Sequence, residues 1–525
     1  MNYEIRMFHS SQLIVHHSSL IFLDMQQTIN RYTTLIGHAT FAILAVLAIV
    51  FWRERTMMLD ASFQSFDIIN KGKLAIQVQR FGAAFVQSFP LVTSKFGLPL
   101  SVVLTSYSLG FIFFHWLSFF ICDKVLKVKA LALGVLMWYM LMTAHTFYWA
   151  QNEIIQGISL TFVYFALLMN RGEFSKLRWW EYPLSIALVF TLVYFHPLII
   201  FPFCFIWGYF FVDRITSFSI LSGSEISKFW KKQDSLTLST SPKLSFGLLA
   251  WSLFGFAAAN YTKFYITGRS AYDKGSSERF ATHIVRPLKE LMTGPSQKMF
   301  WGHCFDDFAL VLPFMVVIIG FYIWQKSFLK LLFFLVSTLG FVFIIATSYY
   351  DSKDWFYLES QYLPLAVMLT IPFVFDIIPS IKKVNWVVGI IGFVLIFKIL
   401  YIVYTHRIYT ERLNYLTELL DKTRKFEGTK FFVDNDHIDE KKLLMYWGSA
   451  YETLYISATQ SPDSTRSIYV APEPGQTLWI TGGRKNFFTI FDNIEYDKAN
   501  KRYFNFQDTT RGYKLLEKKD FAPNQ

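Results

Sequence analysis

The chain has 525 residues, of which 53% are hydrophobic and only 17% are charged, against about 25% charged in a typical soluble protein. Its apolar residues occur in blocks of about 18–25, the length of helix that crosses the hydrocarbon layer of a bilayer. This pattern argues against a large soluble protein with buried helices and predicts a polytopic membrane protein. The net charge of +12 then indicates cytoplasmic loops rich in Lys and Arg, and no aromatic-interleaved basic motif points to nucleic acid.

The N-terminal segment, residues 1–32, contains only short apolar patches. The run Leu20–Leu23 is much shorter than the core of a signal peptide. We expect the native chain to begin at Met25, so that the first span follows a short N-terminus carrying Arg31.

A transmembrane domain with about eleven helices is predicted over residues 33–404. Its apolar segments are Thr33–Trp52, Pro99–Ile121, Ala130–Ala150, Ile154–Met169, Leu184–Val212, Leu244–Asn260, Ala309–Trp324, Leu331–Ser348, Leu363–Ile378 and Val384–Tyr404. The segment Leu184–Val212 would be about 43 Å long as one helix, well over the ~30 Å hydrocarbon core. Because Pro197 lies near its centre and proline breaks helices, we predict two helices that turn at His196-Pro197.

The distribution of basic residues supports this break. With the N-terminus inside, every inner loop carries Lys or Arg, as the positive-inside rule requires. The cluster Lys228–Lys243 falls inside only if the helix turns at His196-Pro197. Loops 53–98, 261–307 and 349–361 and the tail from residue 405 then lie outside. We expect the chain in a bacterial inner membrane, with its C-terminal domain in the periplasm.

The C-terminal domain, residues 405–525, has the pattern of a small α+β module. A helical stretch precedes several strand-like runs, which are separated by Pro, Gly and Asp turns. The helix is Arg407–Lys425, and the strand-like runs are Lys430–Val433, Ser467–Val470, Thr477–Ile480 and Phe487–Phe491. The sequence Asp434-Asn435-Asp436 is interpreted as a turn, and no metal site is predicted.

The first outer loop carries two carboxylates near its start. Asp60 follows the first span, and Asp67 comes seven residues later, so on a helix the two share a face. Gly72 would end this helix, and a second amphipathic helix is expected after Arg80. Both fit helices that lie flat on the membrane. The alternative is that Asp60 only caps its helix, since Asp is a favoured N-cap.

This arrangement resembles the GT-C superfamily of membrane glycosyltransferases. Those proteins have many transmembrane helices and a large first outer loop with flat helices and an acidic residue near its start. The resemblance implies that Asp60 is the general base on the acceptor, or positions acceptor or metal. It also implies a polyprenyl-phosphate sugar donor and a glycan, lipid or protein acceptor. No cofactor is specified, and a divalent metal is compatible with the resemblance.

A second part of the resemblance is the sequence Tyr357–Pro364. Many GT-C proteins enter a late span with an acidic residue, then Arg-Tyr, then Pro. Here Glu359 and Tyr362 match, whereas Gln361 replaces the arginine, which removes direct charge pairing with a lipid phosphate. The alternative is that Tyr362 is an interfacial aromatic residue and Pro364 a helix starter.

Further polar residues are predicted on the same outer side. Glu153 lies at an outer turn beside Gln151, and His196 lies in the broken helix. Ionisable groups at membrane depth are costly and often functional. We therefore add Glu153 to Asp60 and Asp67 as catalytic candidates and treat His196 as a substrate contact, although each alone could be a satisfied interfacial group.

The outer loop 261–307 is rich in basic residues, against the positive-inside rule. Its Arg269, Arg279 and Arg286 are candidates for binding the phosphate of a lipid-linked sugar, because Arg pairs strongly with phosphate oxygens. The alternative is a solvated loop that balances its charge internally. Arg80, in the first outer loop, is a further candidate for binding substrate.

The function predicted from these patterns is transfer of a sugar from a lipid-linked donor. Two alternatives stay open. A transporter or flippase of lipid-linked sugars would also need broken helices, but the chain has no visible two-half repeat. A non-catalytic component of surface-polymer assembly would work through its C-terminal domain.

Overall fold

The computed structural model describes residues 28, 30–221, 244–268, 270–352, 355–471, 486–489 and 493–521. The predictions for the N-terminal segment, Lys228–Lys243, Arg269 and Thr477–Ile480 lie outside these residues. The chain divides into two compact units. The first unit comprises Met1–Ala42, His115–Thr143 and Ile154–Ile399, and the second unit comprises Ile43–Phe114, Ala144–Glu153 and Leu400–Gln525.

The described part of the chain is mostly helical, with a few short strands. Seven of its helices are long and apolar enough to cross a membrane: Asn30–Val50, Leu100–Val125, Glu153–Arg171, Pro197–Thr216, Phe328–Ser348, Leu358–Ser380 and Val384–Thr423. The remaining predicted spans are shorter apolar helices: α6 (Lys129–Met142), α8 (Glu181–Val193), α11 (Phe246–Tyr261) and α15 (Val311–Trp324). These helices indicate a membrane protein, whereas the count of eleven crossings and their orientation stay predictions.

The predicted break at His196-Pro197 is confirmed. Helix α8 ends at Val193, the short 3-10 helix η5 (Pro197–Ile199) follows, and α9 (Ile200–Leu221) begins directly after it. The His196 ring accepts a hydrogen bond from the Leu198 amide at 3.1 Å, which caps η5. The buried ammonium of Lys263 donates to the carbonyl oxygen of Val193 at 2.8 Å, so it satisfies one of the carbonyls left open at the end of α8.

Helix α18 (Pro364–Pro372) packs against four other helices of the first unit. It contacts α6, α9, α15 and α16 (Phe328–Ser348). All of its residues are buried, as expected for a helix that is apolar on every side. Pro364 is its first residue, a position where proline costs no hydrogen bond.

Two helix ends differ from the prediction. Helix α6 ends at Met142, before the predicted Ala150, and the 3-10 helix η3 (His145–Tyr148) follows. In the other direction, α20 (Val384–Thr423) continues past the predicted boundary at Tyr404 without interruption. No Gly or Pro occurs between residues 405 and 423, so nothing in the sequence stops the helix there.

In the second unit, residues 53–98 form the predicted pair of helices. After the short α2 (Trp52–Thr56), the chain forms α3 (Leu59–Lys71) and, beyond the 3-10 helix η1 (Phe81–Ala83), α4 (Ala84–Lys95). Gly72 ends α3 with φ +62°, in the left-handed conformation that glycine adopts without strain. Helices α3 and α4 pack against each other.

The C-terminal part of the second unit contains a three-stranded parallel sheet. Strand β1 (Lys430–Asp434) lies between β2 (Ser467–Ala471) and β5 (Lys514–Leu516). Strands β3 (Asn486–Phe488) and β4 (Asn493–Glu495) form a separate antiparallel pair. The predicted strands at Lys430 and Ser467 are confirmed. Because parallel strands need a long crossover, helix α22 (Ser449–Ala458) connects β1 to β2 and packs on β2.

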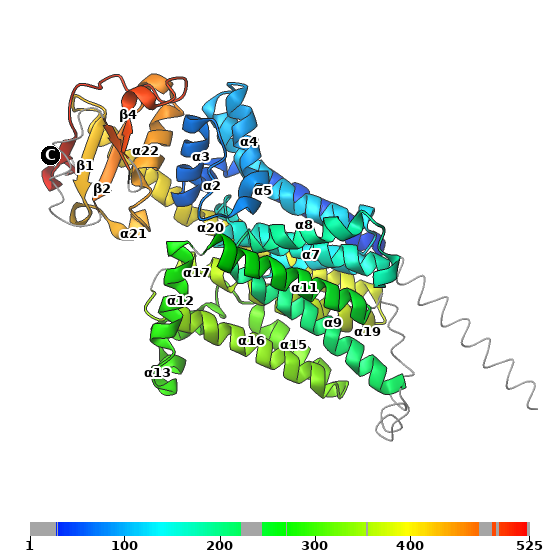
Figure 1. Cartoon of the computed structure of the whole chain (residues 1–525). Coiled ribbons are helices and arrows are strands. Elements are labelled where there is room, and N and C mark those ends of the chain that lie inside the picture. Colours follow the sequence, from blue (N-terminus) through cyan, green and yellow to red (C-terminus); the bar gives the residue numbers. More distant parts are fainter. Residues whose placement is uncertain are drawn as a thin grey trace, which may run out of the picture. The chain divides into compact units, whose positions relative to one another are not determined.

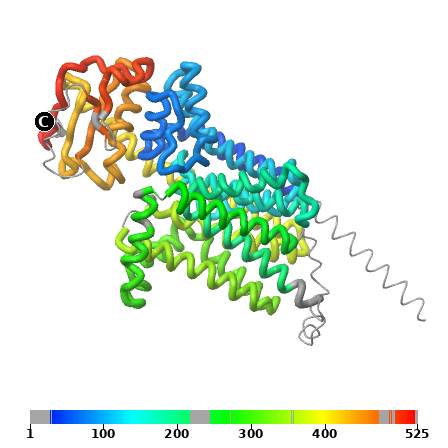
Figure 2. The backbone as a smooth tube through the Cα atoms, in the orientation of Figure 1, coloured from blue at the N-terminus to red at the C-terminus, as the bar shows by residue number. Residues whose placement is uncertain are grey.

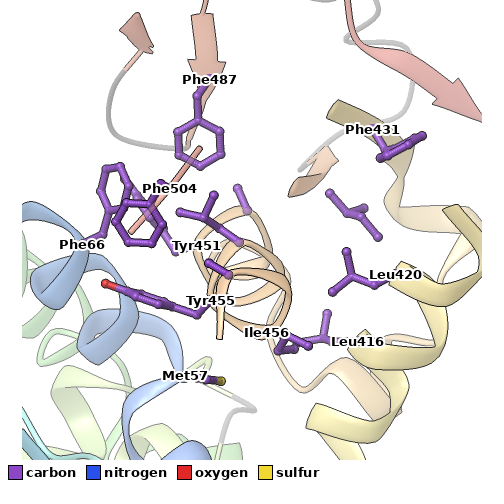
Figure 3. Packing of buried hydrophobic residues seen from close by; sticks show 14 of the residues in the cluster. Met57, Phe66, Leu416, Leu420, Phe431, Tyr451, Tyr455, Ile456, Phe487 and Phe504 are labelled. Carbon is purple, nitrogen blue, oxygen red and sulfur yellow. The ribbon is translucent and has the colours of Figure 1, made fainter. Parts of the chain in front are cut away.

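Helix α22 lies between this sheet and α3 (Figure 1 and Figure 2). Phe66 of α3 packs its ring against Tyr451 of α22 and against Phe504, with ring centroids 5.4 and 5.3 Å apart, and Figure 3 shows this contact. Asn500 joins the same end of α3, donating to Asn70 Oδ1 at 2.7 Å and to the Ile69 carbonyl oxygen at 3.0 Å. Helix α3 and the C-terminal module therefore share one hydrophobic core.

Candidate functional site

Asp60 lies in the first turn of α3, one residue after the helix begins. The N-cap position belongs to Met58, whose side chain makes no capping bond. The Leu59 amide instead donates to the Glu452 carboxylate of α22 at 2.7 Å. The alternative that Asp60 caps its own helix is therefore wrong, and the carboxylate of this half-buried residue is available for another role.

Three polar side chains surround the Asp60 carboxylate. The Gln151 amide donates a hydrogen bond to it. Arg80 and Glu153 form an ion pair beside it, with Nη1 and Oε2 3.3 Å apart. The sequence had placed Asp60, Arg80 and Glu153 among its site candidates, and the structure brings these three together.

This setting makes Asp60 a stronger base than an ordinary aspartate. Burial raises the pKa of the carboxyl most, the negative charge of Glu153 raises it further, and Arg80 and Gln151 partly oppose them, so that the pKa of Asp60 rises from 3.8 to about 6. A carboxylate with this pKa is ionised at neutral pH but holds a proton well enough to remove one from a hydroxyl group. Such a pKa is typical of general bases in enzymes.

Two glutamine side chains hold the helix that carries Asp60. Gln64, one turn further along α3, accepts hydrogen bonds from Gln87 of α4 at 3.0 Å and from the Tyr107 hydroxyl at 3.1 Å. Gln87 also donates to the Ala75 carbonyl oxygen at 3.0 Å. The sequence analysis missed both glutamines, although a buried amide on an apolar helix face is a signal for such a contact.

The buried Arg55 anchors the segment that leads to Gln151 and Glu153. Its guanidinium donates to Ser108 Oγ at 2.7 Å and to the Phe147 carbonyl oxygen, and it lies 4.1 Å from the centre of the Phe147 ring. Phe147 belongs to η3, which ends at Tyr148, shortly before those two residues. Arg55 was also missed, because its partners are distant in the sequence.

Asp67 belongs to a different environment from Asp60. It lies two turns further along α3 and forms an ion pair with Lys71 at 2.9 Å. The predicted catalytic trio is therefore divided: Asp60 and Glu153 share one cluster, and Asp67 pairs with a lysine on its own helix.

The second part of the resemblance, Tyr357–Pro364, begins on α17 (Trp355–Tyr362) in the first unit. Glu359, Gln361 and Tyr362 are all buried, so Tyr362 is not an exposed interfacial residue. Its hydroxyl lies 3.5 Å from Ser296 Oγ. Glu359 lies within electrostatic range of the buried Lys398, whose ammonium donates to the Asp307 carbonyl oxygen at 3.1 Å.

Two of the predicted phosphate-binding arginines stack on tyrosines of the first unit. Arg279 lies 5.3 Å from the centre of the Tyr349 ring, and Arg286 lies 4.4 Å from that of Tyr350. Stacking occupies the face of a guanidinium, whereas phosphate is bound through N–H groups in its plane. Convergence of these arginines with Asp60 on one site stays a prediction.

Two groups among the described residues have metal-ligand composition: His303 with Asp306 and Asp307, and Asp434 with Asp436 and His437. In the first, Asp307 already pairs with His303 at 2.8 Å and accepts a hydrogen bond from Trp355. In the second, Asp434 is the last residue of β1, and Asp436 and His437 lie on the 3-10 helix η9 (Asn435–His437), where the sequence predicted a turn. We propose no metal site at either group.

No significant match to the chain was found among models of protein families, curated proteins or solved structures.

Proposed function

We propose that the chain is a membrane glycosyltransferase of the GT-C kind, with Asp60 as its general base. The observation that carries this proposal is the carboxylate of the half-buried Asp60 at the start of a helix that follows a candidate membrane span. Burial and the charge of Glu153 raise its pKa to about 6. A carboxyl group that only stabilises structure gains nothing from such a pKa, whereas a base needs it.

The reaction would be a direct displacement at the anomeric carbon of the donor sugar. Asp60 takes the proton of the acceptor hydroxyl, and the acceptor oxygen forms the new glycosidic bond. The bond between the anomeric carbon and the phosphate oxygen breaks, and polyprenyl phosphate leaves as an anion. Arginine side chains stabilise that anion, and Arg80, Arg279 and Arg286 are the candidates.

The donor is lipid-linked in this proposal because nucleotide sugars are confined to the cytoplasm. The acceptor is a glycan, lipid or protein outside the cytoplasm, and the chain lies in a bacterial inner membrane with its C-terminal domain in the periplasm. Glu359, Gln361, Tyr362 and His196 are further candidates for substrate contacts.

The test is the variant Asp60→Asn in the full chain, reconstituted in liposomes. The substrate is a synthetic polyprenyl-phosphoryl hexose with an acceptor extract from the cell envelope, and the assay follows release of polyprenyl phosphate. Asn keeps the size of the side chain and removes its basicity, so we expect the rate to fall by roughly 10²–10⁴. The control Asp67→Asn should have a much smaller effect. A folded Asp60→Asn protein that works at the wild-type rate would refute the assignment.

A further inference from the structure

Leu59, the residue before Asp60, has an unusual backbone conformation. Its φ angle is +40°, in the left-handed region that residues with a side chain rarely adopt, and its side chain is buried. A backbone of this kind persists only where its surroundings hold it, and such sites cluster near functional groups. The contacts of Leu59 therefore identify what fixes the start of α3.

The main contact comes from Glu452 of α22, in the C-terminal module. Its Oε1 accepts the hydrogen bond from the Leu59 amide at 2.7 Å, and its side chain is fully buried. Its second oxygen lies 2.5 Å from Nη2 of Arg412. Arg412 is itself held by the carbonyl oxygens of Leu443 and Met445, at 2.7 and 3.0 Å. The Glu452 carboxylate that accepts from Leu59 is thus held in place by Arg412, which is itself held by two backbone carbonyl oxygens.

Gly448 allows this contact to form. A β-carbon at this position would lie 2.5 Å from Oε1 of Glu452, closer than real β-carbons approach other atoms, and 3.1 Å from the α-carbon of Leu59, a tight contact. The backbone of the module therefore touches the start of α3 at a point where only glycine fits without a shift.

We infer that Glu452 is a positioning residue: by holding the amide of Leu59 it sets the direction in which the next side chain, Asp60, points toward the acceptor. A carboxylate at this end of a helix also interacts favourably with the helix dipole. This inference rests on the proposed function, and it assigns the C-terminal module a part in the reaction without any contact to the substrate. A displacement of about 1 Å at a reacting group can reduce the rate by about 10²-fold.

Two double variants separate the hydrogen bond from the buried charges. Arg412→Met with Glu452→Gln keeps an acceptor for the Leu59 amide, and Arg412→Met with Glu452→Leu removes it. Both avoid an unpaired buried arginine, which would itself destabilise the protein. We expect the Leu double variant to lose about 10²-fold in kcat with KM little changed, while the Gln double variant keeps the larger part of kcat.

A second measurement does not depend on sugar transfer. Hydrogen exchange followed by mass spectrometry reports the protection of the peptide that contains Leu59 and Asp60. It should exchange faster in the Leu double variant than in the Gln double variant, in the intact chain in detergent micelles. If wild type transfers no sugar, the proposed function fails, and exchange alone decides whether Glu452 holds α3.

Thr453→Val is the matched control for loss of module stability. Thr453 is next to Glu452 on α22. Its hydroxyl accepts a hydrogen bond from the Ile468 amide of β2 at 2.9 Å, so it holds α22 against the sheet and not against α3. It should lower the melting temperature without changing kcat or exchange around Leu59. Equal kcat and equal exchange in the two double variants would overturn the inference, as would a loss of kcat in Thr453→Val as large as that in the Leu double variant.

Discussion

The pH dependence of sugar transfer follows from the pKa of Asp60. A general base works only when ionised, so kcat/KM should fall on the acid side with a midpoint near the pKa of the free enzyme. With a pKa of about 6, roughly half of the enzyme is active at pH 6 and about one tenth at pH 5. A carboxyl with the ordinary pKa of 3.8 would stay more than about nine-tenths ionised at pH 5.

Two single variants should move this midpoint in opposite directions. Glu153→Gln removes a negative charge beside Asp60 and frees the positive charge of Arg80 to act on it, so the pKa of Asp60 should fall and activity should persist to lower pH. Arg80→Gln removes the positive charge and leaves Glu153 uncompensated, so the pKa should rise and activity should be lost at higher pH. Lower maximal rates are expected in both, which is why the midpoint is the quantity to compare.

The assay is kcat/KM for release of polyprenyl phosphate between pH 4.5 and about 8, with melting temperatures recorded at each pH. Activity that stays constant down to pH 5 in a folded protein would refute the role of Asp60 as the base. A shift of the midpoint in the same direction by both variants would refute the electrostatic account, because charges of opposite sign cannot act alike on one carboxyl group.

Three further predictions can be tested separately. Because folding raises the pKa of Asp60 from 3.8 to about 6, ionisation of Asp60 destabilises the folded protein above pH 6 and has no effect below pH 3.8. Each unit of pKa shift corresponds to about 1.4 kcal/mol. Asp60→Asn should therefore stabilise the protein at pH 7.5 by up to roughly 3 kcal/mol, and by less where solvent screens the charge. The quantity to measure is the melting temperature of the variant minus that of wild type. A larger increase at pH 4 than at pH 7.5 would contradict this prediction. Gly448→Ala should destabilise the module by about 1–3 kcal/mol through overpacking against Leu59. The control is Gly275→Ala, whose added β-carbon has no atom within 4 Å, and it should not destabilise the protein. Equal changes in melting temperature in the two variants would disprove the close contact. In a cysteine-free background, a cysteine replacing Gly275 should react with an impermeant reagent from outside and one replacing Lys326 should not, and the reverse would invert the proposed topology.

Local features of the fold could be predicted from the sequence because local chemistry determines them. Pro197 lacks the backbone N–H that a continuous helix needs, which favours a break near the centre of the long apolar segment, and Gly72 provides the conformation that stops α3. The strands at Lys430 and Ser467 follow from their apolar β-branched and aromatic residues. The continuation of α20 past Tyr404 was missed because a change from apolar to polar residues does not itself end a helix.

The candidate site could be predicted only in part. Asp60, Arg80 and Glu153 were singled out individually, because each is an ionisable residue in an unusual position. Their mutual contacts come from three segments of the chain, and a single sequence holds no signal for such pairings. The same limit applies more strongly to Glu452, whose partner Leu59 lies 393 residues away.

The shared core of α3 and the C-terminal module has a consequence for the order of events during synthesis. Asn70 and Asn500 are 430 residues apart, so at typical rates of translation the partner of α3 emerges roughly 20–90 s after the helix itself. During that interval the ring of Phe66 has neither Tyr451 nor Phe504 to cover it. The helix that carries Asp60 is therefore among the first parts of the chain to be made and among the last to be completed, so a nascent or truncated chain has an unfinished site.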